Sequence, residues 1–407
     1  MKVAVIGLGV EGKKAVKSLQ EHKCEVYATD LNENIQLESG DELDLDLDLG
    51  RHDFDKIFSS DAVVLSPSLW ESDLAQKLIE SKKLLSDVIG GNRSIFTIAV
   101  TGTNGKTTTS FMIRDILKNA GLNVLLGGNA GGGFDGYTEM ILESEVNSYD
   151  VLVVEVCDMT MGFCDYNFQF DLVVVTNLGR DHLDYHGSLD EYLQRVGKFL
   201  KGKRAILNKT DNLLQKVSKN AEICEFYGEC DYSTHLFGKF NKYNAGAAEA
   251  VSKALQIDDQ IIKDTLENFN AIEGRIKSYN IYGSKVVIGK TDNADAISSV
   301  LNEMDFPVIF IGTPRPNETW RLEILEEALK ANPSLLVVFP GLDSDLEPAM
   351  HKLKCLDFQG QLKIAKNTDE ILTIILNRAK NGDNVLIGGN GQSTILKIQK
   401  KLENTDI

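Results

Sequence analysis

The sequence has little positive charge. Its 407 residues include 43 Lys and Arg against 60 Asp and Glu, a formal net charge of −17 at pH 7. General binding of nucleic acid needs a basic surface, so this balance argues against a nucleic-acid partner. It does not exclude small anionic ligands, because a phosphate site is built locally from backbone N–H groups and one or two cations.

Sequence features that indicate other classes of protein are also missing. None of the six cysteines forms a Cys-x2-Cys pair, which argues against a zinc knuckle or a redox pair and favours reduced thiols. The N-terminal MKVAVIGLG lacks the form of a signal peptide, and no apolar run approaches the ~20 residues that span a bilayer. We therefore expect a cytoplasmic protein without a membrane span, long enough for two or three domains.

Residues 95–121 are typical of a nucleotide-binding loop between a strand and a helix. The apolar run at 95–100 predicts a buried strand, and the helical pattern after the loop stops at Gly121. Lys106 would reach the β- and γ-phosphates of ATP, and the hydroxyl of Thr107 would bind Mg²⁺. The expected ATP-binding residues of the loop are Gly102, Thr103, Asn104, Gly105, Lys106, Thr107 and Thr108.

This loop departs from the general Gly-x4-Gly-Lys-Thr motif, because Val100 stands where the first glycine is expected. Gly102 supplies the turn instead and gives a shorter loop. A glycine-rich turn before an ordinary helix is the alternative interpretation. The pair Lys106 and Thr107 at the helix start favours nucleotide binding.

The N-terminal segment is typical of a Rossmann-like unit. A strand at residues 2–6 leads into GLGVEG (7–12), then a helix, then a second strand that ends at Asp30. This order is the dinucleotide-binding pattern. Its ligand could be NAD or another nucleotide, because any pyrophosphate can use the same helix N-terminus. A polar break, GGNR at 90–93, is the expected end of this domain.

Strand and helix patterns alternate along the rest of the chain. Strands are predicted at residues 124–126, 151–156, 171–176, 204–208 and 222–227, and again at 286–288, 308–311, 335–339, 362–364 and 385–387. Glu155 ends its strand, so it should lie at the sheet edge where ligands bind. The predicted fold is α/β with three domains: Rossmann-like (1–92), a central P-loop ATPase-type parallel sheet (93–276), and C-terminal Rossmann-like (277–407).

Four segments together resemble the Mur ligase superfamily, the ATP-dependent amino-acid ligases of cell-wall precursor synthesis. They are TGTNGKTT (101–108), Glu155, NLGRDHLDYHG (177–187), and GKFNKYNAGAAEA (238–250) followed by EGR (273–275). The resemblance covers essentially the whole chain, and its N-terminal unit looks most like the D-glutamate-adding branch. It implies that the first domain holds a UDP-linked precursor, with Gly9 and Val10 as the expected contacts. A monomer is expected.

The implied reaction uses ATP, Mg²⁺, the UDP-linked precursor and a free amino acid. A precursor carboxylate attacks the γ-phosphate to give an acyl phosphate and ADP, and the amine of the amino acid then displaces phosphate. The protein mainly positions groups and neutralises charge in such a reaction. The resemblance gives catalytic roles to Lys106 and His182. It implies that Thr107 and Glu155 bind a first Mg²⁺ and that His182 binds a second Mg²⁺.

Three further residues receive roles from the resemblance. Asn129 would contact the precursor carboxylate, Asn241 the adenine and Arg275 the phosphates. The alternatives are a helix-start cap for Asn241, a surface cation for Arg275, and a helix-cap or core histidine for His182.

The chain departs from the family pattern beside the second metal and in its last third. Several family members carry a carbamylated lysine four residues after the tyrosine that corresponds to Tyr192. Here that residue is Val196, and Lys198 falls on the opposite helix face. Either this ligand is absent or the register differs. The segment IGKTDN (288–293) also lacks the aspartate expected at the ribose, and GGNGQS (388–393) lacks the Lys and His of the corresponding loop.

These changes lie where the incoming amino acid should bind. A relative that builds the peptide of archaeal pseudomurein is therefore weighed beside a bacterial D-glutamate ligase. Lys290 and Arg315 are the candidates for holding the incoming carboxylate, and both could equally be surface cations.

Two other functions stay open at this point. A ligase like folylpolyglutamate synthase would use a different acceptor, but that family lacks a Rossmann-like domain before its P-loop. An NAD-binding regulator with a P-loop switch would leave Glu155, His182 and Arg275 without a shared task.

Overall fold

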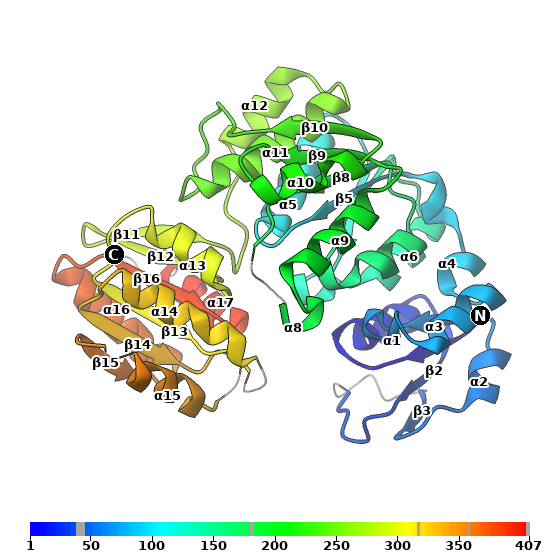
Figure 1. The fold of residues 1–407 in the computed structure, drawn as a ribbon, viewed down its shortest axis with the longest axis horizontal. Coiled ribbons are helices and arrows are strands. Elements are labelled where there is room, and N and C mark those ends of the chain that lie inside the picture. The colour runs from blue at the N-terminus through cyan, green and yellow to red at the C-terminus, as the bar shows by residue number, and fades with distance from the viewer. Residues whose placement is uncertain (38–44, 180–182, 316–317, 343, 357, 404–407) are drawn as a thin grey trace. The chain divides into compact units, whose positions relative to one another are not determined.

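The computed structural model describes residues 1–37, 45–179, 183–315, 318–342, 344–356 and 358–403. The chain divides into two compact units, one made of residues 1–178, 185–230 and 244–266 and the other of 179–184, 231–243 and 267–407. Within them lie three sheets with helices packed against them, drawn in Figure 1. The α/β class with several parallel sheets is confirmed, whereas the domain boundaries at 92 and 276 stay predictions.

The first sheet has four parallel strands in the order β3 (Asp46–Leu49), β2 (Glu25–Asp30), β1 (Lys2–Ile6) and β4 (Ala62–Leu65). Its helices are α1 (Val10–Glu21), α2 (Phe54–Ser59), α3 (Asp73–Ser81) and α4 (Leu85–Val88). The turn from β1 into α1 depends on glycine. Gly7 has φ +87°, and a Cβ on Gly12 would lie 1.8 Å from the Gly7 carbonyl oxygen. The helix can therefore start directly at the end of β1.

The second sheet is entirely parallel among the described strands, in the order β10 (Ile223–Tyr227), β9 (Arg204–Asn208), β8 (Leu172–Val175), β5 (Phe96–Thr101), β7 (Val151–Glu155) and β6 (Val124–Gly128). Its helices are α5 (Lys106–Asn119), α6 (Tyr137–Val146), α7 (Met161–Asn167), α8 (Leu183–His186), α9 (Leu189–Leu200), α10 (Asn212–Val217), α11 (Phe240–Ala254) and α12 (Asp259–Glu267). Because β5 lies between β7 and β8, the loops after these three strands meet at one edge.

The first two sheets share one apolar core. A single cluster of buried side chains includes Val5 of β1, Val16 of α1, Tyr137 of α6 and Val154 of β7. Helix α1 therefore packs between its own sheet and α6. This common core fixes the start of α1 relative to the loops of the second sheet.

The third sheet lies in the other unit. Its order is β11 (Lys277–Ile281), β12 (Ser284–Ile288), β16 (Val385–Gly389), β13 (Val308–Gly312), β14 (Leu335–Phe339) and β15 (Gln361–Ile364). Strand β11 pairs antiparallel with β12 through the tight turn Tyr282-Gly283, where both residues have positive φ. Helices α13 (Ala294–Leu301), α14 (Glu323–Lys330), α15 (Glu347–Cys355), α16 (Thr368–Lys380) and α17 (Gln392–Glu403) complete it. In the described part of the chain, every helix is too short or too polar to cross a bilayer.

Candidate active site

The loop after β5 has the conformation that a phosphate-binding loop needs. Gly102 has φ +126° and Gly105 has φ +87°, values that favour glycine. A Cβ on Gly102 would lie 2.2 Å from the hydroxyl of Thr176, and a Cβ on Gly105 would lie 2.2 Å from the amide oxygen of Asn244. Both glycines are therefore required by space as well as by φ.

Lys106 begins helix α5 and lies over this loop. Its Nζ donates to the carbonyl oxygens of Gly102 at 2.7 Å and Thr103 at 2.9 Å. The helix N-terminus adds partial positive charge at the same place. The loop, Lys106 and the start of α5 thus form an electropositive cradle that fits the phosphates of a nucleotide, with Thr108 in the same first turn.

Three predicted site residues meet beside the cradle. The Thr107 hydroxyl donates to Glu155 Oε2 at 2.6 Å, and Asn129 Nδ2 donates to Glu155 Oε1 at 3.2 Å. Glu155 is 1% exposed and Thr107 is 8% exposed. A Cβ on Gly132 would lie 2.2 Å from Glu155 Oε1, so the glycine-rich loop at residues 127–134 closes against the carboxylate. A hydroxyl and a carboxylate are hard oxygen ligands, and this pair fits Mg²⁺.

Two residues that follow β8 hold the nucleotide-binding loop in place, and one of them, Asn177, begins the 177–187 segment of the sequence analysis. Asn177 accepts from the Asn104 N–H at 3.0 Å and donates its amide N–H to the Asn104 carbonyl at 2.9 Å. The Thr176 hydroxyl donates to the same carbonyl at 2.6 Å. Both anchors directly follow β8, the strand next to the P-loop strand, so their side chains reach the loop.

His182 lies outside the described residues, so its predicted metal and catalytic roles stay predictions. His186, at the end of α8, is buried with its Nε2 2.7 Å from Asp158 Oδ2, and its ring stacks on Tyr192 at 4.3 Å between centroids. On the following helix, Val196 is fully buried in the core whereas Lys198 is exposed. Val196, at the position that the resemblance gives to a modified lysine, is thus part of the apolar core, and the absence of that ligand stays a prediction.

The start of α1 presents an open backbone. A Cβ on Gly9 would have no atom within 4 Å, and Val10 is 56% exposed. Asp30, the acid of the dinucleotide pattern, accepts from the Leu8 N–H at 2.6 Å and from the Asn32 N–H at 2.8 Å. This carboxylate stabilises the glycine turn itself.

Glu11 links this turn to the second sheet, a role that the sequence did not indicate. It accepts from the Ala130 N–H at 2.7 Å and from the Tyr137 N–H at 3.4 Å. Burial raises the pKa of Glu11 to about 7, although these two hydrogen bonds act in the opposite direction. The residue therefore joins the start of α1 to the loop that carries Asn129.

Asn241 and Arg275 belong to the other compact unit. Asn241 is 4% exposed and its Nδ2 donates to the Phe237 carbonyl at 2.8 Å. The Arg275 carbonyl accepts from Gln399 Nε2 at 2.9 Å. Their assigned contacts with adenine and phosphate stay predictions. The residue of α11 that lies against the P-loop is Asn244, which the sequence did not single out.

A second polar cluster lies where β12, β13 and β16 end. Asp292 is 3.0 Å from Lys290 Nζ and 2.8 Å from Arg321 Nη1, and Arg321 also donates to Asn390 Oδ1 at 3.2 Å. Burial alone would raise the pKa of Asp292, but the two cations outweigh it and hold that pKa well below its usual range. Arg315 is 53% exposed in its side chain and pairs with Glu318 at 3.4 Å.

Comparison with known proteins finds relatives of similar sequence and solved structures of similar fold. Residues 100–226 match the Mur ligase middle domain. The UDP-N-acetylmuramoylalanine--D-glutamate ligase of Desulfitobacterium hafniense is 26% identical over 95% of this chain and 92% of its own.

Two solved structures have the same fold. The pseudomurein peptide ligase type C from Methanothermus fervidus has a TM-score of 0.62 at 20% identity and covers 98% of this chain and 99% of its own. The E. coli FolC, solved with DHPP and ADP, has a TM-score of 0.62 at 16% identity and covers 80% of this chain and 92% of its own.

Proposed function

We propose, from the premise that the chain is a Mur-type ligase, that it joins an amino acid to the carboxylate of a UDP-linked cell-wall precursor at the expense of ATP. The resemblance found in the sequence is confirmed by the middle-domain match and by the D-glutamate-ligase relatives. The observation that carries the proposal is the meeting of Lys106, Thr107, Glu155 and Asn129 at one sheet edge.

Each residue at this edge has a task in forming an acyl phosphate. The loop amides and Lys106 hold the phosphates of ATP and neutralise charge that moves towards the leaving ADP. Thr107 and Glu155 would hold Mg²⁺, which supplies charge neutralisation at the β- and γ-phosphates when bound. Asn129 donates to Glu155 with one end of its amide and accepts from the Gly131 N–H with the other, so its orientation is fixed.

The precursor is proposed to bind at the start of α1, where Gly9 and Val10 are open to an anionic pyrophosphate. Glu11 fixes this start to the loop that contains Asn129. One end of the precursor could therefore be held at α1 while its carboxylate reaches the Lys106 loop. The proposed setting is the cytoplasm, with the chain acting as a monomer.

The cluster around Asp292 is proposed to receive the incoming amino acid. An amino acid is a zwitterion, so its carboxylate needs a cation and its ammonium needs an acceptor. Lys290, Arg321 and Asp292 offer both within a partly enclosed site. Lys290 is 24% exposed in its side chain and stays the candidate for the carboxylate, whereas the exposed Arg315 would serve at the rim.

The other two functions fit the structure less well. An NAD-binding regulator needs the acid after β2 for a ribose, but Asp30 accepts hydrogen bonds from two backbone N–H groups of its own turn. A folylpolyglutamate-synthase-like ligase needs no counterpart of β1–β4, yet in this chain that sheet shares its core with the second sheet. The precursor-dependent ligase uses both sheets.

The test is ADP formation by the purified chain with ATP and Mg²⁺. The first pair of substrates is UDP-N-acetylmuramoylalanine with D-glutamate, followed by other UDP-linked muramoyl and pseudomurein precursors with a set of amino acids. We expect ADP only when a precursor and its amino acid are both present, with a product heavier by one residue. Tight NAD binding together with no productive pair would refute the ligase.

A further inference from the structure

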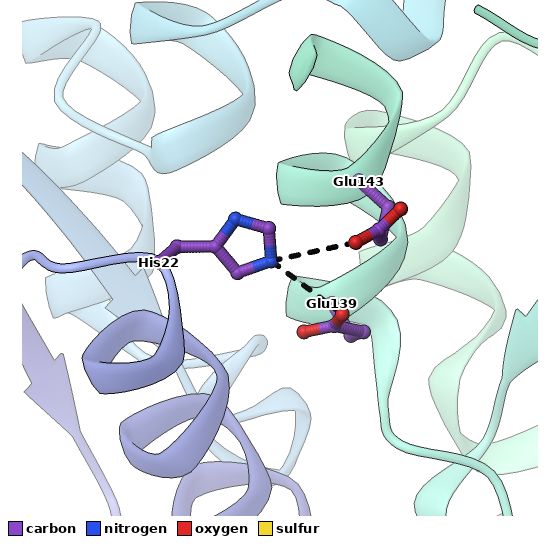
Figure 2. Close-up of side chains that lie close together, drawn as sticks. All are labelled: His22, Glu139 and Glu143. Atoms are coloured by element: carbon purple, nitrogen blue, oxygen red, sulfur yellow. Dashed lines mark hydrogen bonds and ion pairs between the residues drawn. The ribbon is translucent and has the colours of Figure 1, made fainter. Parts of the chain in front are cut away.

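A second group of metal-ligand side chains lies away from the nucleotide-binding loop, between α1 and α6. His22 follows the last residue of α1, and Glu139 and Glu143 are one turn apart on α6. One ligand atom from each lies within 4.8 Å of the other two. Figure 2 shows the imidazole of His22 pointing between the two carboxylates.

The distances fit a shared ion better than a direct hydrogen bond. His22 Nε2 is 3.5 Å from Glu139 Oε1 and 3.8 Å from Glu143 Oε1. A good hydrogen bond between such groups has a length of about 2.7–3.2 Å. Two ligands held at about 2.0–2.2 Å from one tetrahedral Zn²⁺ are about 3.3–3.6 Å apart. The observed separations lie close to the second range.

The surrounding hydrogen bonds leave the two oxygens beside His22, Oε1 of Glu139 and Oε1 of Glu143, available to an ion. Tyr149 donates to Glu143 Oε2 at 3.0 Å and Asn147 donates to the same oxygen at 2.8 Å, which orients Oε1 towards His22. Within the described chain, Glu139 Oε2 is buried and has no hydrogen-bond partner. A buried carboxylate oxygen without a donor is costly, and a cation bound to the same carboxylate through Oε1, the oxygen beside His22, would offset part of this cost.

We propose that His22, Glu139 and Glu143 bind a divalent transition-metal ion of the Zn²⁺ type. One imidazole nitrogen with two carboxylates suits Zn²⁺, whereas Mg²⁺ and Ca²⁺ prefer an all-oxygen set. The three side chains are 17–27% exposed, so water can complete the coordination. The site is separate from the Thr107–Glu155 pair and uses none of its residues.

The ion would join the two helices that organise the precursor side of the enzyme. Helix α1 begins at the open Gly9–Val10 backbone and ends at His22, while α6 follows the loop that contains Asn129. Glu11 already links the first turn of α1 to the N-terminus of α6. A metal at His22 adds a second link at the far end of α1, so its role is to hold α1 against α6.

The test is zinc binding by the untagged chain in excess Mg²⁺, measured by competition with a chromogenic chelator. We expect one Zn²⁺ per chain, at least tenfold weaker binding in His22→Gln and in Glu143→Gln, and about tenfold weaker binding in Tyr149→Phe. His351→Gln is the matched control, because His351 is exposed on α15 in the other unit. The wild type should also melt at a higher temperature with Zn²⁺ than without it.

Two results would overturn the proposal: no zinc binding by the wild type, or equal affinity in wild type and His22→Gln. Should either variant fail to fold, anomalous diffraction from zinc-soaked wild-type crystals decides. A peak between His22 Nε2 and the two carboxylates supports the site, and its absence there rejects it in favour of a simple ion pair.

Discussion

The edge of the second sheet and the edge of the third sheet hold polar groups in different ways. At the second, glycine turns and backbone hydrogen bonds shape the loop, and Glu155 accepts hydrogen bonds from Thr107 and Asn129. At the third, Asp292 lies between two cations in an ion-pair cluster. In the proposed function the first edge receives a fixed ligand, the phosphates of ATP. The second is built from side chains, which can change with the substrate.

The largest expected effect is at the nucleotide-binding loop. Lys106→Ala should lower turnover about 10³-fold, because it removes a preorganised charge from the phosphates. We expect the fold to be kept, since Nζ donates to two carbonyl oxygens of the loop itself. Steady-state ADP release measures the turnover, and circular dichroism shows whether the fold is kept. Normal turnover in this variant would remove the nucleotide loop from the mechanism.

At the third sheet the expected effect is on the free energy of unfolding and on the KM for the incoming amino acid. Arg321→Met should destabilise the chain by about 3 kcal/mol, because it leaves Asp292 buried with one cation instead of two. The KM for the amino acid should rise while the KM for ATP stays unchanged. Urea unfolding measures the stability change, and substrate titrations measure the two KM values. The matched control is Arg315→Met, an exposed site where the stability change should stay within about 0.5 kcal/mol.

Acid should weaken the same cluster. Because the pKa of Asp292 is lower in the folded chain than its unfolded value of about 3.9, its stabilisation is present above that value. It is lost as the pH falls below about 4 towards the folded pKa. Asp292→Asn should reduce the acid sensitivity of unfolding. An unchanged acid transition in that variant would show that the cluster does not control it.

Glu11, which links the first two sheets, should give the opposite dependence of stability on pH. The pKa of Glu11 is raised from 4.5 to about 7, so the protonated form is favoured by folding and stability is lost as the pH rises from about 4.5 to 7. The size is of the order of 3 kcal/mol. Glu11→Gln, which stays uncharged, should remove this dependence in urea unfolding between pH 5 and pH 8. If stability changes with pH as steeply in Glu11→Gln as in the wild type, Glu11 is not the cause of this pH dependence.

The smallest expected effect is at Lys198. The Lys198 side chain is exposed, and the position that the resemblance gives to a modified lysine holds the buried Val196, so Lys198→Ala should change turnover less than about twofold. Turnover is measured with and without added bicarbonate. A large loss rescued by bicarbonate would restore a carbamylated lysine to the mechanism.

The sequence predicted the α/β class and the P-loop, because these follow from apolar strands and from glycines in a turn before a helix. The pairing of Thr107 with Glu155 came from the resemblance to Mur ligases, and the two side chains do meet. It did not indicate β11, a short polar hairpin strand whose side chains are mostly half-buried or exposed. Nor did it indicate Asn244, Glu11 or Arg321. Each depends on a contact between segments far apart in the chain, and no local pattern marks such a partner.

The central claim is that the Lys106 loop phosphorylates a carboxylate. The most direct measurement uses a UDP-linked precursor with ¹⁸O at both oxygens of the reacting carboxylate, with the amino acid and ATP, and mass analysis of the released phosphate. An acyl phosphate transfers one carboxylate oxygen to phosphate when the amine attacks, so we expect one ¹⁸O atom in the phosphate for each peptide bond. Phosphate without ¹⁸O, formed together with the ligated product, would contradict the account.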